Sequence, residues 1–118
     1  MVTKNVIGAQ GEQLAAGWLR RHGMQILATN WTCQAGEIDI VARDGTDLVV
    51  VEVKTRTSTR FGMPSEAVLG AKYARLRRLA GWWLAEHQQR YRDVRIDVVA
   101  ILLRDQRPAL LQHLRGVD

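Results

Sequence analysis

The pattern of hydrophobic and polar residues along the chain predicts a helix, three strands, a second helix and two further strands. The first helix is expected over residues 6–22, where Gly23 ends it. The three strands that follow are expected over 24–31, 37–43 and 48–56. The second helix is expected over 65–89, and the last two strands over 95–103 and 108–114.

Turn residues and proline place some of these strands. Asp44-Gly45 is a strong hairpin signal, so the second and third strands are expected to be neighbours. The valines from Val49 to Val53 indicate a central strand. The last strand opens with Pro108, which places it at an edge because proline cannot donate to a ladder.

Each helix has a predicted buried face. In the first helix, small residues such as Gly8 and Ala15 allow close approach of another element, and Glu12 lies at the edge of this face. In the second helix, Ser65 is the expected N-cap and Trp82 lies off the apolar stripe. The stripes are Gly8, Gly11, Ala15, Trp18 and Leu19 in the first helix, and Leu69, Tyr73, Leu76, Ala80 and Trp83 in the second.

The length of 118 residues fits one domain, residues 1–118, with a single core. No apolar run reaches the 18 or so residues of a membrane span, and no secretory signal is evident at the N-terminus. Cys33 is the one cysteine, so it forms no internal disulfide and suits a reducing cytoplasm. We expect it to be a buried or half-buried thiol.

The net charge of +5 is unevenly distributed. Residues 54–92 carry nine basic side chains against two acids, a balance of +7, which leaves −2 for the rest of the chain. A basic segment that follows an acidic cluster is typical of a site where metals and phosphates meet. The alternative is a solvated helix face, and charge alone does not separate the two.

Acidic residues interrupt two of the predicted strands. Glu37 and Asp39 share one face of theirs, as do Glu52 and Lys54 of the next, because alternate strand residues point the same way. The alternating apolar residues are expected to face a core, Ile38 and Ile40 together on one strand and Val49, Val51 and Val53 on the next. Charges beside a core are costly unless they are paired or hold a metal.

Such an arrangement is suited to phosphodiester cleavage with a divalent cation. Mg²⁺ prefers oxygen ligands, which Asp39 and Glu52 can supply, and Glu12 can complete the set from the first helix. Lys54 can orient the attacking water or stabilise charge on the phosphate. The structural alternative is an ordinary polar hairpin face, because a Glu-x-Lys pattern is weak by itself.

Several sequence segments together resemble the YraN-type family of bacterial proteins. This resemblance spans roughly Ile7 to Ile101. The segments are Gly8-x-x-Gly11-Glu12-x-x-Ala15, Gly36-Glu37-Ile38-Asp39, Val51-Glu52-Val53-Lys54-Thr55-Arg56, Gly62-x-x-Ser65-Glu66-Ala67-Val68, Lys72 and Arg95-Ile96-Asp97-Val98-Val99.

The resemblance implies an α/β fold of the restriction-endonuclease-like PD-(D/E)xK superfamily, similar to archaeal Holliday-junction resolvases. It implies a mixed central sheet flanked by helices, in αβββαβ order. Glu12 matches the helix acid, Asp39 the motif aspartate, and Glu52 with Lys54 the (D/E)xK element. The sequence departs from the motif at Ile38, where the pattern has proline.

Residues around this core have less specific roles. Glu37 is either a second acid behind the site or the partner of an arginine. Asp97 is expected to form a structural ion pair rather than to bind metal. Nucleic-acid contacts are expected from Arg56, Arg60, Lys72 and Arg75, and structural or solvated roles from His22, His87 and His113.

The sequence therefore predicts a cytoplasmic, Mg²⁺- or Mn²⁺-dependent nuclease that acts on DNA, including branched or structured DNA, with RNA as a second substrate class. A homodimer or a protein partner is expected, because so small a domain has no specificity module. The first alternative is a nucleic-acid-binding module that needs a partner for activity. The second is a structural or protein-interaction domain.

Overall fold

The computed structural model describes residues 3–58 and 70–117, with only the backbone of residues 70–72. Its elements follow the order that the hydrophobic pattern predicts, and most boundaries agree within a residue or two. They are α1 (Lys4–Arg21), β1 (Gln25–Cys33), β2 (Gly36–Asp44), β3 (Asp47–Arg56), α2 (Gly70–His87), β4 (Asp93–Arg104) and β5 (Arg107–Leu114).

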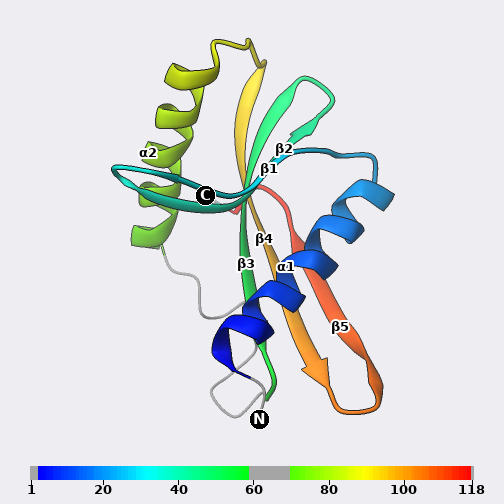
Figure 1. The fold of residues 1–118 in the computed structure, drawn as a ribbon. Helices are drawn as coiled ribbons and strands as arrows, with labels where there is room; N and C mark the ends of the chain where they lie inside the picture. The colour runs from blue at the N-terminus through cyan, green and yellow to red at the C-terminus, as the bar shows by residue number, and fades with distance from the viewer. Residues whose placement is uncertain (1–2, 59–69, 118) are drawn as a thin grey trace.

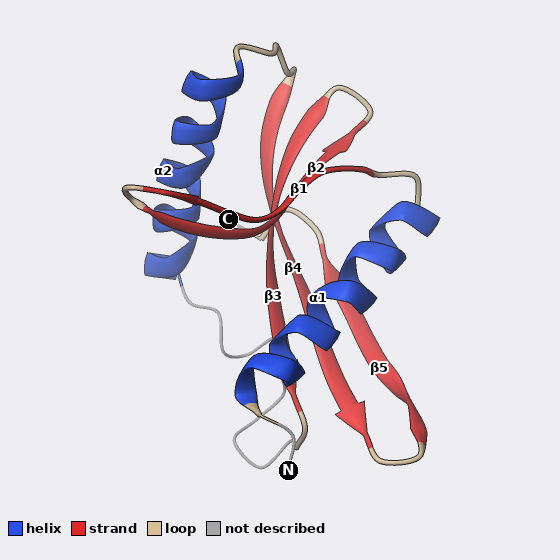
Figure 2. Ribbon diagram, in the orientation of Figure 1, coloured by secondary structure: helices blue, strands red, loops and turns tan. Residues whose placement is uncertain are grey.

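The five strands form one mixed sheet in the order β1-β2-β3-β4-β5. β3 and β4 are parallel, whereas the other neighbouring pairs are antiparallel. A parallel pair needs a long crossover, and α2 lies in that connection (Figure 2). The predicted β2–β3 hairpin and the predicted edge position of β5 are both confirmed.

Each helix covers one face of the sheet (Figure 1). The buried residues form two apolar layers, one on each face of the sheet, rather than the single core that the length suggests, and we call them the α1 core and the α2 core. Alternation along β3 divides its side chains between them, because Val49 and Val51 lie in the first and Leu48 and Val50 in the second. The α1 core contains Ala15, Ala16, Leu19, Met24, Ile40, Ala42, Val49, Val51, Val99 and Ile101. The α2 core contains Ile38, Val41, Leu48, Val50, Leu76, Leu79, Ala80, Trp83 and Ile96.

Strand β2 does not keep one face toward one core. Ile38 and Ile40 were expected to share a face, yet Ile40 lies in the α1 core and Ile38 in the α2 core. The reason is that β2 pairs with β3 only as far as Ile40 and then continues with β1 alone. The freed hairpin tip coils toward α2 (Figure 1), where the Trp31 and Trp83 rings meet edge to face at 5.3 Å.

The helices differ from expectation in two details. A Cβ added at Gly8 would meet nothing within 4 Å, so the predicted close approach there is wrong. The close approach occurs at Gly11, where a Cβ would overlap the Thr55 hydroxyl of β3. Helix α2 ends at His87 rather than at Gln89, because Gln88 adopts a positive φ of 44°.

The second predicted helix is partly described. Leu76, Ala80 and Trp83 are buried as expected, and Leu79 joins them. Trp82 lies off this face and is 45% exposed. The predicted start of this helix lies outside the described residues, together with the predicted cap Ser65 and Leu69. None of the described helices is long and apolar enough to cross a membrane.

Candidate active site

The candidate site lies where β2 separates from β3. The regular pairing of these strands runs from Asp44 and Asp47 to Ile40 and Val51 and then stops. One residue further along β2, the Asp39 carboxylate accepts a hydrogen bond of 2.9 Å from the Val53 backbone N–H. The side chain thus satisfies a donor of β3 that strand pairing no longer uses. This bond fixes Asp39 beside β3.

Glu52 and Lys54 lie on β3 on either side of Val53, the residue that bonds Asp39. Glu52 is only 8% exposed, and it follows Val50 of the α2 core on the same side of the strand. The Lys54 ammonium lies 3.6 Å from the Glu52 carboxylate, and its side chain is 19% exposed. The pair is therefore largely withdrawn from solvent, where charge interactions are stronger than in water.

Asp39 has a strongly raised pKa in this position. The pKa of Asp39 is raised from 3.8 to about 7, mainly by burial of the carboxyl group and next by the charge of Glu52. The hydrogen bond from Val53 opposes this shift, while Glu12 and Glu37 add smaller increases. Asp39 therefore lies in a field of excess negative charge, which a bound cation would relieve.

Glu12 contributes to this negative charge from the opposite side of the sheet. Its helix, α1, covers the α1 core, whereas Glu52 lies on the face of α2. Gly11 packs on Thr55, next in the chain to Lys54, so the contact sets where Glu12 stands relative to β3. Glu12 is half-buried and acts on Asp39 through its charge.

The donor set fits a hard divalent cation through two carboxylates. Among residues 3–58 and 70–117, no three acidic, histidine or cysteine side chains are grouped closely enough to hold a metal ion. The predicted three-ligand set of Glu12, Asp39 and Glu52 is thus not assembled in this structure. Mg²⁺ usually takes one or two carboxylates and keeps several waters, and Asp39 with Glu52 matches that requirement.

Of the remaining predicted site residues, the structure describes the side chains of Glu37, Arg56 and Arg75. Glu37 is exposed and has no ion-pair partner among the described residues. Arg56 and Arg75 are exposed on β3 and α2, and Arg56 donates a hydrogen bond of 3.1 Å to the Thr55 carbonyl. Arg60 and the side chain of Lys72 lie outside the described residues.

A second polar cluster is structural. The predicted ion pair of Asp97 with Arg95 is confirmed, with Nε 2.9 Å and Nη2 3.1 Å from the two carboxylate oxygens. Asp97 is fully buried and also bonds His113 Nε2 at 2.8 Å and the Gly116 N–H at 3.0 Å. His113 Nδ1 accepts from the Trp18 indole at 3.3 Å, so Nε2 carries the hydrogen donated to Asp97.

Sequence reasoning missed two features near these clusters. The role of His113 depends on residues far apart in the chain, and no local signal points to it. Asn30 adopts a positive φ of 51° inside β1. Asparagine tolerates that conformation better than most residues, which is the only sequence signal for it.

Comparison with known proteins gives one family. The model of the uncharacterised protein family UPF0102 matches residues 11–101, a range that holds Glu12, Asp39, Glu52 and Lys54. The chain is 56% identical to a UPF0102 protein of Beutenbergia cavernae over 99% of both chains. It is 51% identical to one of Arthrobacter sp. (strain FB24), again over 99% of both, and 50% identical to one of Frankia alni over 98% of this chain and 97% of the relative. This chain therefore belongs to the UPF0102 family.

Proposed function

We propose that this protein is a metal-dependent nuclease that hydrolyses phosphodiester bonds in DNA, with a fold of the restriction-endonuclease-like PD-(D/E)xK type. The observation that carries the proposal is the juxtaposition of Asp39, Glu52 and Lys54 at the separation of β2 and β3. Two carboxylates from neighbouring strands lie beside a lysine there. The mixed sheet with a helix on each face supports the fold assignment.

In this proposal, Asp39 and Glu52 hold Mg²⁺ or Mn²⁺. The metal, when bound, polarises the scissile phosphate and lowers the pKa of a water. Lys54 donates hydrogen bonds to the attacking water or to a phosphate oxygen, and its ion pair with Glu52 at 3.6 Å holds the ammonium at the site. Glu12 adds negative charge from the α1 side, which favours cation binding at Asp39.

Four basic residues are assigned to contacts with the phosphate backbone of the nucleic acid. Arg56 continues β3 beyond Lys54, and Arg75 lies on the exposed face of α2. Together with Arg60 and Lys72 they would neutralise phosphates, so binding should weaken steeply with salt. Branched or otherwise structured DNA is the proposed substrate class, and a second copy of the chain or another protein is the proposed partner.

A labelled panel tests the proposal. Wild type is incubated with single-stranded, duplex, flapped and four-way-junction DNA and one RNA, in Mn²⁺, Mg²⁺ and EDTA. The variants are Asp39→Asn and Lys54→Ala, and Asp105→Asn is the matched control because Asp105 is an exposed acid on the β4–β5 turn. We expect cleavage by wild type and by the control, a loss of at least 100-fold in both site variants, and no cleavage in EDTA.

The outcomes separate the candidate functions. If Asp39→Asn keeps its fold and still cleaves DNA, the assignment of Asp39 to the active site is wrong. Salt-sensitive binding to one structure without cleavage by wild type identifies a binding module that needs a partner. If wild type neither binds nor cleaves any member of the panel, nucleic acid is excluded as the substrate.

A further inference from the structure

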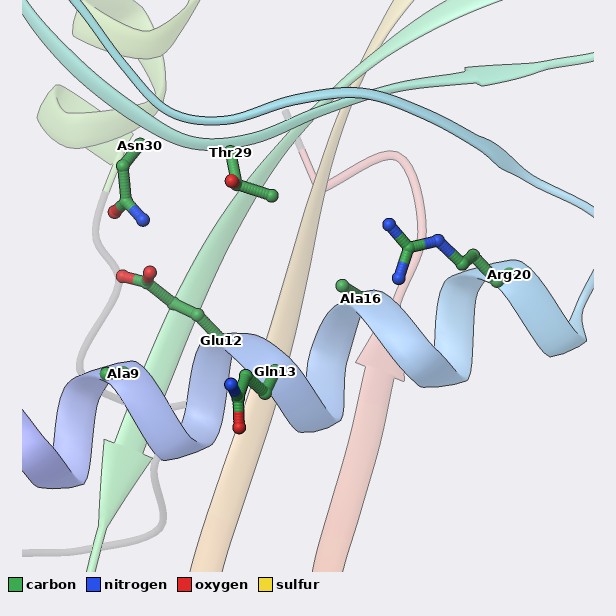
Figure 3. Close-up of a pocket in the computed structure, with 7 residues that line it drawn as sticks. All are labelled: Ala9, Glu12, Gln13, Ala16, Arg20, Thr29 and Asn30. Atoms are coloured by element: carbon green, nitrogen blue, oxygen red, sulfur yellow. The ribbon is translucent and has the colours of Figure 1, made fainter.

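A pocket opens between α1 and β1, on the side of the molecule opposite α2. Its volume is about 440 Å³, within the usual range for ligand sites (Figure 3). Five of its seven lining residues have polar side chains, and two alanines form an apolar floor on the helix. The lining residues are Ala9, Glu12, Gln13, Ala16, Arg20, Thr29 and Asn30.

The pocket adjoins the candidate active site from two elements. Glu12 lines the pocket and also acts on Asp39 through its charge. Thr29 pairs with Ile40 and Trp31 with Ile38, so Asn30 lies between these pairs, across from Asp39. Figure 3 shows the Asn30 amide turned toward the Glu12 carboxylate. Whatever occupies this pocket therefore contacts Asn30, which lies opposite Asp39 in the β1–β2 pair.

Asn30 has an unusual backbone conformation. Its φ of 51° interrupts the regular strand geometry between two paired positions. Left-handed conformations at residues other than glycine are costly and concentrate at functional sites. Here the residue with this conformation lines the pocket, so the conformation bears on how its amide faces a ligand.

The polar groups of the pocket are available to a ligand. Among the residues that the structure describes, the side chains of Gln13, Arg20, Thr29 and Asn30 have neither a hydrogen bond nor an ion pair. Two amides and a hydroxyl offer both donors and acceptors, as the edge of a nucleobase requires. The Arg20 guanidinium, turned along α1 toward Thr29 in Figure 3, offers a fixed positive charge for a phosphate.

We propose that this pocket receives one unpaired nucleotide of the DNA strand, beside the phosphodiester bond that is cut. The inference rests on the proposed nuclease function. Asn30 and Gln13 bind the edge of the base, the floor of Ala9 and Ala16 contacts its face, and Arg20 binds the adjoining phosphate. A base in a regular duplex cannot enter such a pocket without leaving the stack. The substrate is therefore DNA with an unpaired residue at the cleavage position.

Binding without cleavage tests this inference. Fluorescence anisotropy measures the Kd of two labelled strands, a 12-residue thymidine DNA and a 12-residue abasic DNA with the same number of phosphates. Binding is measured in Ca²⁺, which prefers oxygen ligands as Mg²⁺ does. The variants are Arg20→Ala and Asn30→Gly, since glycine accepts the positive φ without strain. The control is Arg21→Ala, because Arg21 is also an exposed arginine but lines a different pocket, with Leu14 and Trp18.

We expect wild type to bind the thymidine strand at least fivefold more tightly than the abasic strand. Asn30→Gly should lose this preference, and Arg20→Ala should weaken both complexes fivefold or more, whereas Arg21→Ala changes either Kd less than twofold. Equal binding of the two strands by wild type overturns the base pocket, as does a Kd of Arg20→Ala equal to that of Arg21→Ala.

The same proteins, tested for cleavage in Mn²⁺, separate this inference from the nuclease proposal. If wild type cleaves DNA but the pocket variants do not change Kd, the nucleotide-binding role of the pocket is wrong and the nuclease proposal stands. Base-dependent binding with no cleavage keeps a nucleotide-binding pocket and removes the nuclease. Circular dichroism melting of each variant shows that a changed Kd does not come from unfolding.

Discussion

At the scale of a single residue, Asp39 is subject to two opposing effects on its protonation. Its carboxylate accepts a hydrogen bond from Val53, which favours the charged form, but burial and Glu52 favour the protonated form more strongly. The folded protein therefore holds the proton on Asp39 up to a pH of about 7, against an ordinary value of 3.8. A residue suited to receive a cation is here a source of instability without one.

Asp39→Asn should therefore stabilise the metal-free protein at alkaline pH. The pKa of Asp39 is raised on folding, so its contribution to stability is full below pH 3.8 and is lost as the pH rises through about 7. The shift sets an upper limit of about 4 kcal/mol. We expect the variant to melt roughly 5–10 °C higher than wild type at pH 8 in EDTA, and the two to converge near pH 4. Melting followed by circular dichroism measures this, and equal Tm values at pH 8 would contradict it.

Asp97 shows the opposite behaviour. Burial alone would raise its pKa, but the hydrogen bonds from His113, Arg95 and the Gly116 N–H hold the pKa below its ordinary value of 3.8. Its contribution to stability is therefore present above pH 3.8 and is lost as the pH falls through the lower folded pKa. Removing the charge breaks the ion pair with Arg95 and leaves Arg95 its second ion pair, with Asp44 at 3.0 Å.

Asp97→Asn should lower stability at pH 7 by about 3–5 kcal/mol, the usual cost of breaking a buried ion pair from one side. Urea unfolding at pH 7 measures this loss, and the difference from wild type should shrink below pH 3.8. Asp93→Asn is the control, since Asp93 is exposed and bonds only the neighbouring Val94 N–H among the described residues. A loss below 1 kcal/mol in Asp97→Asn would show that the cluster is not structural.

At the scale of elements, the contact of α1 with β3 positions one side of the site. Gly11 lies on Thr55, so the helix approaches β3 at the residue after Lys54. Glycine inside a helix costs about 1 kcal/mol relative to alanine. The close approach explains that cost at Gly11, whereas Gly8 faces open space.

Gly11→Ala and Gly8→Ala should consequently have opposite effects. The methyl group at Gly11 overlaps Thr55, and we expect a loss of about 1–3 kcal/mol, as for other overpacked sites, together with reduced cleavage because Glu12 is displaced. The methyl group at Gly8 meets nothing and should raise stability by about 0.5–1 kcal/mol. Urea unfolding compares the two, and equal effects would show that α1 does not pack on β3 as described.

At the scale of the whole molecule, metal binding should be linked to folding. Asp39 and Glu52 are adjacent only in the folded state, so a cation that binds them stabilises that state. We expect Mn²⁺ at 100 times its Kd to stabilise wild type by about 2.7 kcal/mol, with little effect on Glu52→Ala. Differential scanning calorimetry against Mn²⁺ concentration tests this, and an equal rise in Tm for both proteins would place the metal elsewhere.

The sequence predicted the elements because each has a local signal, such as the Asp44-Gly45 turn or the valines of β3. It also predicted that Asp39 and Glu52 would lie on neighbouring strands, since a short turn joins those strands. It did not predict that Ile38 and Ile40 enter different cores, that Asn30 lines a pocket or that His113 bonds Asp97. These features follow from the coiling of β2 and from long-range packing, which no window of the sequence contains.

The parallel pairing of β3 with β4 has a consequence for the order of folding. The strands β1, β2 and β3 are joined by short turns, whereas β4 can dock only after the chain from residue 57 to residue 92 has closed a loop. Loop-closure entropy makes that step the slower one. Asp39, Glu52 and Lys54 all belong to the early meander, so we expect their strands to associate before the sheet is complete. Kinetic φ values higher for Val41→Ala than for Val98→Ala would support this order, and the reverse would exclude it.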